Sequence, residues 1–148
     1  MTKYLLDTNI ILRFTDTDSA EYDLINNTIL KILVAGGQCF ITSQVITEFW
    51  VVATRPTTVN GLGWTVEKTE QAVEMLINQF DLLEETPAIF PQWLSPVKSY
   101  KISGKRAHDL RIQSVMLTHN ILHILTLNPQ DFVAIEGITI IHPNNLNS

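Results

Sequence analysis

Four acidic residues, far apart along the chain, are the side chains best suited to carry chemistry: Asp7, Glu48, Asp109 and Asp131. Two follow segments typical of strands and two lie on segments typical of helices, so folding can gather all four at one edge of a sheet. Carboxylates held close together repel one another unless divalent cations lie between them, and ligands that are all oxygen favour Mg²⁺ or Mn²⁺ over zinc. We therefore expect metal-assisted phosphoryl chemistry, in which a bound ion lowers the pKa of an attacking water.

Each acid also has a simpler explanation. Asp7 and Asp131 can cap the helix or turn that follows them, and Asp109 stands in the first turn of an expected helix, where the helix dipole favours any acid. Glu48 lies among large apolar residues and needs a cation or hydrogen bonds, unless it flanks the core and reaches water. Arg55 is a possible ion-pair partner, but its spacing of seven residues is not the favoured one.

Basic residues gather around one of these acids, although the chain carries a net charge of −5. Half of the ten Lys and Arg residues fall in one short window whose only acid is Asp109: Lys98, Lys101, Lys105, Arg106 and Arg111. A phosphodiester held by Lys105, Arg106 or Arg111 would lie beside the Asp109 carboxylate, and His108 can touch the same substrate. The alternative is a solvated loop and helix face.

Strand-like and helix-like segments alternate along the chain. Expected strands are Tyr4–Leu6 (continued by Ile10–Leu12), Cys39–Ile41, Asp81–Leu83, Ile121–Leu127 and Ile138–Ile141. Expected helices are Ser19–Ala35, one capped by Thr42 or Ser43 and ended by Arg55-Pro56, Thr65–Phe80, one or two short helices in Ala88–Tyr100, and Ala107–His119. This order predicts an α/β fold: a three-layer α/β/α sandwich with a mostly parallel central sheet. Its ligand site should lie beyond the carboxyl ends of the strands, where strand order reverses.

Bulk composition narrows the class of protein. A chain of 148 residues with 45% hydrophobic and 17% charged residues fits a single globular domain over residues 1–148. One cysteine, Cys39, excludes an internal disulfide and thiolate metal sites, and without a signal sequence or membrane span we expect a cytoplasmic protein. Gly104-Lys105-Arg106 is not a P-loop, Asn9 replaces the second acid of aspartyl-nucleophile phosphatases, and no serine or cysteine triad motif occurs.

Four blocks of sequence, in order and spacing, resemble those of PIN domains across nearly the whole chain. They are Leu5–Asn9, Ile41–Ser43 leading to Glu48-Phe49, Gly104–Ile112 and Thr126–Phe132. The resemblance implies an α/β/α sandwich, Mg²⁺ or Mn²⁺, and endonucleolytic cutting of RNA. It also implies that Asp7, Glu48, Asp109 and Asp131 form the acidic cluster, and that Thr8, Asn9, Thr126 and Asn128 orient these carboxylates or metal-bound waters. Pro129 stiffens the last block, which leaves the roles of Asp131 and Asn128 open.

Small stand-alone members of this family resemble toxins of bacterial toxin–antitoxin pairs. That resemblance implies a homodimer that is held inactive by a small antitoxin protein, and a dimer would account for part of the apolar composition. The alternative is a non-catalytic PIN-fold module that binds RNA or protein, which the intact set of acids argues against.

Overall fold

The computed structural model describes residues 1–146, and within them the central sheet has five strands in the order β3-β2-β1-β4-β5. All four neighbouring pairs are parallel, which confirms the predicted sheet. The strands are β1 (Lys3–Leu6), β2 (Gln38–Ile41), β3 (Asp81–Leu82), β4 (His123–Leu125) and β5 (Thr139–Ile141).

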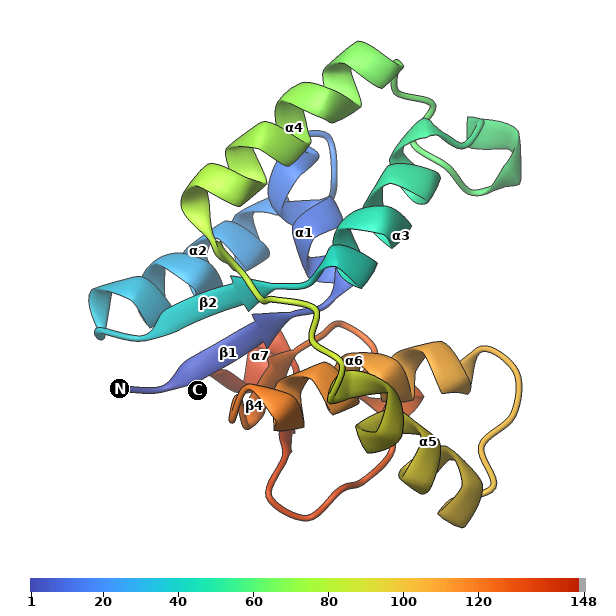
Figure 1. Cartoon of the computed structure of the whole chain (residues 1–148). Helices are drawn as coiled ribbons and strands as arrows, with labels where there is room; N and C mark the ends of the chain where they lie inside the picture. The colour runs from blue at the N-terminus through green and yellow to red at the C-terminus, as the bar shows by residue number, and fades with distance from the viewer. Residues whose placement is uncertain (147–148) are drawn as a thin grey trace.

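Helices cover both faces of the sheet, so the three-layer sandwich is confirmed (Figure 1). On one side lie α1 (Thr8–Thr15), α2 (Tyr22–Val34), α3 (Ser43–Thr54) and α4 (Val66–Gln79). On the other side lie α5 (Ile89–Ser99) and α6 (Arg106–Thr118), while α7 (Pro143–Leu146) follows the last strand and contacts α2. The short helices η1 (Thr57–Val59) and η2 (Pro129–Asp131) lie in connections.

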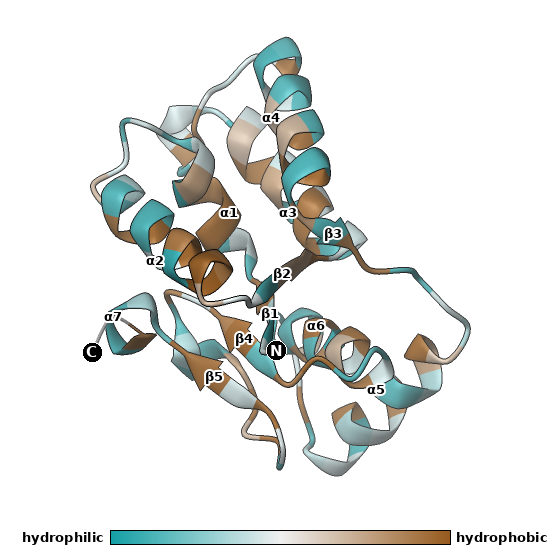
Figure 2. Ribbon diagram, turned by 90° about the vertical axis from the view of Figure 1, so that its left-hand side faces the viewer, coloured by the Kyte–Doolittle hydropathy of each residue, from teal (hydrophilic) through white to brown (hydrophobic). Residues whose placement is uncertain are grey.

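The core forms between the helices and the central strands β1 and β4. Leu5 and Leu6 of β1 and Ile124 and Leu125 of β4 are fully buried, as expected for parallel strands with helices on both faces. In Figure 2, α1 is mostly hydrophobic, whereas α2 and α4 alternate hydrophilic and hydrophobic residues, which is the pattern of helices with one face in water. The site is therefore built on a rigid, apolar base.

The predicted strand continuation over Ile10–Leu12 is wrong, because these residues belong to α1. Asp7 caps this helix, and its side chain accepts a hydrogen bond from the Thr8 backbone N–H. A short apolar run does not distinguish a buried strand from a buried helix, and here the cap decides for the helix. The strand expected over Ile121–Leu127 is shorter as well, since β4 covers only His123–Leu125.

Strand order reverses between β1 and β4. The chain runs from β1 outward to β2 and β3, then returns to place β4 and β5 on the other side of β1. A crevice forms beyond the carboxyl ends of strands at such a point, and here it lies after Leu6 and Leu125. Within residues 1–146, no helix has both the length and the apolar character needed to cross a bilayer.

Candidate functional site

Asp7 follows β1 directly and is held by both carboxylate oxygens. Oδ1 accepts a hydrogen bond from the Thr8 backbone N–H at 2.7 Å, and Oδ2 accepts one from the Thr126 hydroxyl at 2.7 Å. Only 8% of the residue is exposed. The cap interpretation and the pocket interpretation are therefore both compatible with its position, because the oxygens that accept these bonds have further lone pairs.

Thr126, which follows β4, connects the ends of the two central strands. Its hydroxyl donates to Asp7 and accepts from the Asn128 backbone N–H at 3.0 Å and from Asn9 Nδ2 at 3.4 Å. Asn9 also accepts a hydrogen bond from the Leu127 backbone N–H through Oδ1, at 3.1 Å. The start of α1 and the loop after β4 are thus fixed against each other, and with them the direction of the Asp7 carboxylate.

Glu48 extends from the middle of α3 and is half-buried. Its Oε1 accepts a hydrogen bond from the Thr8 hydroxyl at 3.5 Å, which links it to the Asp7 segment. The Arg55 ion pair considered from the sequence does not form, because Arg55 donates instead to the Asn60 backbone carbonyl at 3.1 Å. The geometry therefore turns the Glu48 carboxylate toward the strand ends.

Asp109 and Asp131 line the same pocket from α6 and from η2. Asp109 lies in the first turn of α6, is only 8% exposed, and its carboxylate makes no hydrogen bond within the described part of the chain. Asp131 ends η2, and its Oδ2 lies 3.9 Å from Lys105 Nζ. The Lys105 side chain is 78% exposed, so this ion pair contributes little to stability and leaves the ammonium group accessible.

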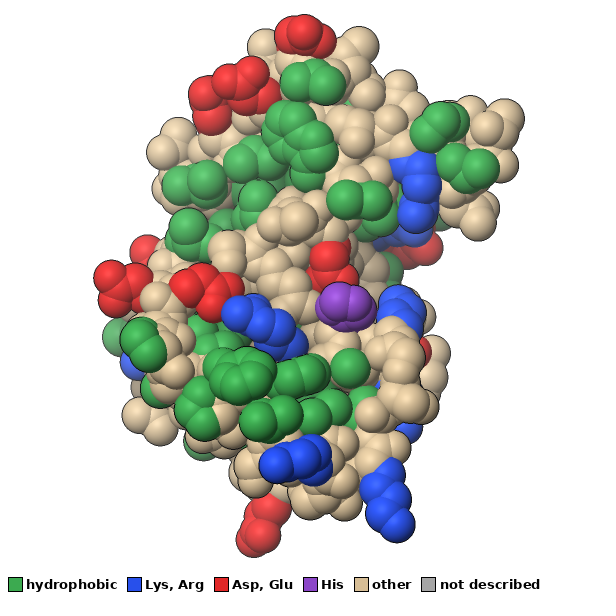
Figure 3. All heavy atoms as spheres, turned by 45° about the vertical axis from the view of Figure 1, so that its right-hand side comes forward, with side chains coloured by type: hydrophobic (Ala, Val, Ile, Leu, Met, Phe, Trp, Pro, Cys, Tyr) green, Lys and Arg blue, Asp and Glu red, His purple; other side chains and the backbone are tan. Residues whose placement is uncertain are grey.

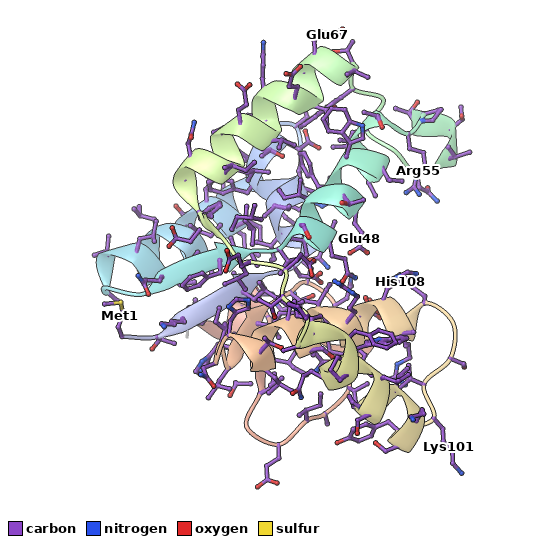
Figure 4. All side chains as sticks on the ribbon, viewed as in Figure 1. Met1, Glu48, Arg55, Glu67, Lys101 and His108 are labelled. Atoms are coloured by element: carbon purple, nitrogen blue, oxygen red, sulfur yellow. The ribbon has the colours of Figure 1, made fainter. Side chains whose placement is uncertain are left out.

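These side chains line one pocket of about 200 Å³. Its walls include all four acids, three of the polar residues that the resemblance singled out, one lysine and two apolar side chains: Asp7, Glu48, Asp109, Asp131, Thr8, Asn9, Asn128, Lys105, Leu12 and Val52. Figure 4 shows Glu48 on α3 facing the end of α6 that carries His108. In Figure 3, this part of the surface is a narrow waist where an acidic side chain meets a histidine, between two broader lobes. The structure thus brings together acids from four separate segments.

The pocket disfavours the charge of its own carboxylates. The pKa of Asp109 is raised to about 6, mainly by burial; Lys105 opposes this shift, and nearby Asp7 and Asp131 contribute to it. Burial also raises the pKa of Asp7 and of Glu48, and Glu48 is additionally repelled by Asp7 and Asp109. A cation among these groups would remove the repulsion.

The donor set fits a hard divalent cation held partly by water. Oxygen ligands are typical of Mg²⁺, which usually keeps several waters and takes only one or two carboxylates from the protein. Between residues 1 and 146, no three His, Cys, Asp or Glu side chains are close enough to form a preformed metal cage. Asp7 and Asp109, the two most buried of the acids, would hold the ion, and Glu48 and Asp131 line the same pocket beside them.

The basic residues are dispersed. Only Lys105 lines the acidic pocket; His108 and Arg111 line a neighbouring one, and Arg106 is exposed outside both. Lys101 points into solvent well away from Glu48 (Figure 4). Lys98 is also exposed, on the last turn of α5. The basic window of the sequence therefore contributes one cation to the acidic pocket itself.

Sequence analysis missed a polar network beside the pocket. Gln44, one turn before Glu48 on α3, donates to the His108 backbone carbonyl at 2.8 Å, and Arg111 pairs with Glu85 at 3.0 Å. The spacing of Gln44 and Glu48 was a usable signal, because residues four apart share one helix face. Nothing in the sequence indicated Glu85, which lies in the loop after β3.

The α/β/α sandwich with an acidic pocket at the point where strand order reverses is the arrangement that the sequence resemblance to PIN domains implied. A family model described as the PIN domain matches residues 4–137, and the chain belongs to this family. Among curated proteins, no sequence matches this chain.

Several solved structures share the fold. VapBC2 of Rickettsia felis bound to a promoter DNA fragment matches with a TM-score of 0.69 and 18% identity over 95% of this chain and 98% of that chain. VapBC-1 of nontypeable Haemophilus influenzae has a TM-score of 0.68 and 20% identity over 97% and 99% of the two chains. VapC20 of Mycobacterium tuberculosis, described as a toxin that cleaves the sarcin–ricin loop, has a TM-score of 0.57 and 11% identity over 82% and 86%. At these identities the similarity establishes the fold.

Proposed function

We propose that this protein is a metal-dependent endoribonuclease that hydrolyses RNA phosphodiester bonds. The observation that carries the proposal is the single pocket lined by Asp7, Glu48, Asp109 and Asp131 at the switch point of the sheet. Membership of the PIN-domain family supports it, as does the sarcin–ricin loop cleavage attributed to the structurally similar VapC20.

The roles of the residues follow from their surroundings. When bound, Mg²⁺ or Mn²⁺ supplies positive charge that stabilises the developing phosphate charge and lowers the pKa of an attacking water. Asp7 is the principal ligand because Thr8 and Thr126 fix both of its oxygens, and Asp109 is the second. Glu48, whose pKa is raised by burial, suits the acceptance of a proton from water at Oε1 or Oε2.

The remaining polar residues position the carboxylates or attract the RNA. Asn9, Thr126 and Asn128 keep the strand ends in register, and Thr8 holds Glu48. Lys105 reaches the acidic pocket and binds a phosphate oxygen next to the scissile bond, and Asp131 lines the same pocket with its Oδ2 3.9 Å from Lys105 Nζ. Arg106 and His108 contact RNA further out, where both are exposed.

We further propose that the protein is the toxin of a toxin–antitoxin pair, acting in the cytoplasm as a homodimer inhibited by a small partner protein. Support comes from the VapBC complexes and from FitAcB of Neisseria gonorrhoeae, which has a TM-score of 0.60 over 95% of this chain and 97% of its own. Exposed apolar side chains on α2 and α4, including Val34 and Ile77, supply surface that such contacts would cover.

RNA cleavage by purified protein tests the proposed activity. We expect cutting with MgCl₂ or MnCl₂, none with EDTA, and loss of cutting in Asp7→Asn and Asp109→Asn. Asp23→Asn is the matched control, since Asp23 is an exposed acid on α2 outside the pocket. Thermal melting of each variant shows that it is folded. Full activity of folded Asp7→Asn or Asp109→Asn would refute the assignment.

A non-catalytic PIN-fold module that binds RNA or protein is the second candidate. The observation that favours it is the lack of a preformed metal cage within residues 1–146. Manganese titration by calorimetry separates the two: a nuclease binds Mn²⁺ in the native chain and loses binding in Asp7→Asn, whereas a binding-only module gives the same trace for both.

A further inference from the structure

A second pocket lies next to the acidic one and has a different set of lining residues. It has a volume of about 420 Å³ and is lined by Ser43, Gln44, Thr47, Glu48, Glu85, His108 and Arg111. Glu48 lines both pockets, so the two are contiguous on the surface. Whereas carboxylates dominate the first pocket, hydrogen-bond donors converge at one end of the second.

Those donors converge on the carboxylate of Glu85. Arg111 binds it with both terminal nitrogens, at 3.0 Å from Nη2 to Oε2 and 3.3 Å from Nη1 to Oε1. The Ser43 hydroxyl donates to Oε1 at 2.6 Å. Hydrogen bonds from these donors lower the pKa of Glu85, with Arg111 the larger cause. The group held here is therefore an anion bound in the bidentate geometry that guanidinium offers to carboxylates and phosphates alike.

The start of α3 adds to the attraction for an anion. Ser43 and Gln44 are its first two residues, and Thr42 caps it through the Val45 N–H. The backbone N–H groups of Ser43 and Gln44 have no acceptor within the helix. Helix N-termini favour negative charge and bind phosphate through these amides. Arg111 itself is oriented by Gln44, whose Oε1 lies 3.4 Å from Nη1.

The Glu85 side chain can be displaced from these hydrogen-bond donors. It lies in the loop between β3 and α5, its side chain is 42% exposed, and that of Arg111 is 37% exposed. Ion pairs at such exposure add little to stability. The loop backbone is held independently, because His119 Nε2 lies 2.8 Å from the Glu84 carbonyl and Leu83 N–H donates to the Ile41 carbonyl at 2.9 Å. The side chain can therefore leave without unfolding the loop.

We propose that Arg111, Ser43 and the N-terminus of α3 form a phosphate subsite for the RNA strand, and that the Glu85 carboxylate occupies this subsite in the free protein and is displaced by an RNA phosphate. The inference rests on the proposed ribonuclease function, since it gives the RNA beyond the acidic pocket a second anchor. It also makes Glu85 a built-in competitor that weakens binding of any RNA whose phosphate must enter this subsite.

Glu85→Gln tests this directly, with Glu84→Gln as the matched control that removes the same charge from the neighbouring exposed residue. Binding of a fluorescein-labelled, single-stranded RNA is measured by anisotropy in EDTA, so that no cutting occurs. We expect Glu85→Gln to bind about tenfold more tightly than the native chain, the gain of one charged hydrogen-bonded contact. Glu84→Gln should stay close to the native affinity.

The double variant Glu85→Gln/Arg111→Met removes the liberated donor and should return the affinity to the native value or below. Freeing Arg111 should also steepen the salt dependence of log K by about 0.7, the change expected for one added contact to a single strand. Circular dichroism and thermal melting confirm that each variant is folded. In MgCl₂, Glu85→Gln should lower KM for RNA cleavage with little change in kcat.

Equal affinities for Glu85→Gln and Glu84→Gln would overturn the proposal, as would tight binding that persists in the double variant. Inorganic phosphate serves as a competitor: it should weaken RNA binding by Glu85→Gln more than by the double variant, and equal competition would also count against the subsite. The test of the subsite is separate from the test of the nuclease. If the native chain cuts RNA but Glu85→Gln binds RNA no more tightly than the native chain, the proposed ribonuclease function stands and only the subsite is refuted.

Discussion

Among single side chains, Thr126 has the most connections in the candidate site. One hydroxyl donates to Asp7 and accepts from Asn9 and from the Asn128 backbone N–H. Neutral Thr126 thereby determines where a charged group points, as residues behind metal ligands commonly do. The chemistry of Asp7 therefore depends on a side chain that carries no charge.

Thr126→Val keeps the shape of this residue and removes its hydroxyl. We expect Mn²⁺ affinity to fall by about 10- to 100-fold and the free energy of unfolding to fall by about 1–3 kcal/mol, because Asp7 Oδ2 and the Asn128 N–H lose their partner in a buried site. Calorimetric titration and urea unfolding measure the two effects. Thr69→Val is the control: Thr69 is equally buried, but its hydroxyl bonds only within α4. Similar losses of metal affinity in both variants would contradict the role of Thr126.

We expect Asp109 to make the stability of the metal-free protein depend on pH. Its pKa is raised by burial to about 6, compared with about 3.9 in an unfolded chain. Between these values the folded state binds more protons than the unfolded state, so the free energy of unfolding falls as pH rises through this window and stays lower above it. Asp109→Asn removes the penalty and should be about 1–3 kcal/mol more stable than the native chain at neutral pH.

Urea unfolding in EDTA across this pH range checks the expectation. The native chain should lose stability from about pH 4 to about pH 6. Asp109→Asn should show a flatter profile, with a residual slope from Asp7 and Glu48, whose pKa values burial also raises. Asp23→Asn, at an exposed position, should follow the native chain. Parallel profiles for the native chain and Asp109→Asn would show that Asp109 is not the source.

Residue types and order were enough to place the acids, but not the groups that hold them. Asp7 could be placed because it stands directly after an expected strand, where a parallel sheet brings neighbouring ends together. Thr126, which holds Asp7, was singled out only by the resemblance to PIN domains and fell inside the strand expected over Ile121–Leu127, whereas β4 ends at Leu125. The partner of Arg111 could not, because Glu85 reaches it from a loop whose path depends on the packing of β3 and α5. Contacts set by tertiary structure leave no periodic trace in the sequence.

At the scale of elements, the connection from α3 to α4 holds the helix that carries Glu48. The chain after Arg55 folds back along the end of α3, where Leu62 N–H donates to the Val52 carbonyl at 3.0 Å and Trp64 N–H to the Ala53 carbonyl at 2.8 Å. The Trp64 ring packs edge-on against Phe49, with ring centroids 6.3 Å apart. This connection is thus a closely packed return that fixes the last turn of α3.

Gly61 is the point of closest approach in this return. A Cβ placed there would lie 1.9 Å from the Arg55 carbonyl oxygen, so the backbone must move to accept any side chain. We expect Gly61→Ala to lower the free energy of unfolding by about 1–3 kcal/mol, as overpacking does, and to reduce RNA cutting by displacing α3. Urea unfolding and the cleavage assay measure both. If this variant is as stable as the native chain, the connection between α3 and α4 is not closely packed at Gly61.

Gly104→Ala is the comparison for Gly61→Ala. Gly104 has no neighbour within 4 Å of an added Cβ, and its φ of +65° is the only obstacle to a side chain. Its cost should be about 1 kcal/mol, the usual penalty of a left-handed residue. A greater loss at Gly104 than at Gly61 would mean that backbone conformation outweighs close packing in this protein.

The types and order of the helices and strands could be predicted from the sequence more accurately than their boundaries. Helices with one apolar face, such as α2 and α4, and strands whose buried residues alternate, such as β2, were predictable because burial on one side imposes a period. The segment Ile10–Leu12 was misassigned because three consecutive buried apolar residues fit a buried strand as well as one side of a short helix. Short apolar runs are therefore the segments in which sequence periodicity distinguishes helix from strand least well.

Across the whole molecule, the acidic pocket joins the two helical layers of the sandwich. Glu48 comes from α3 on one face of the sheet, Asp109 from α6 on the other, and Asp7 and Asp131 from the segments after β1 and β4. A cation shared by these groups would therefore connect the two helical layers with the strand ends between them. Metal binding and global stability should then be linked.

We accordingly expect MgCl₂ to raise the melting temperature of the native chain, with a gain of about 2.7 kcal/mol once the ion exceeds its dissociation constant a hundredfold. Differential scanning calorimetry at increasing MgCl₂ measures this, and NaCl at matched ionic strength separates binding from screening of the acids. Asp109→Asn should begin more stable in EDTA and gain much less, because its penalty is already gone and a ligand is missing. An equal gain in NaCl, or an equal response of Asp109→Asn, would mean that the carboxylates of the two layers do not share an ion.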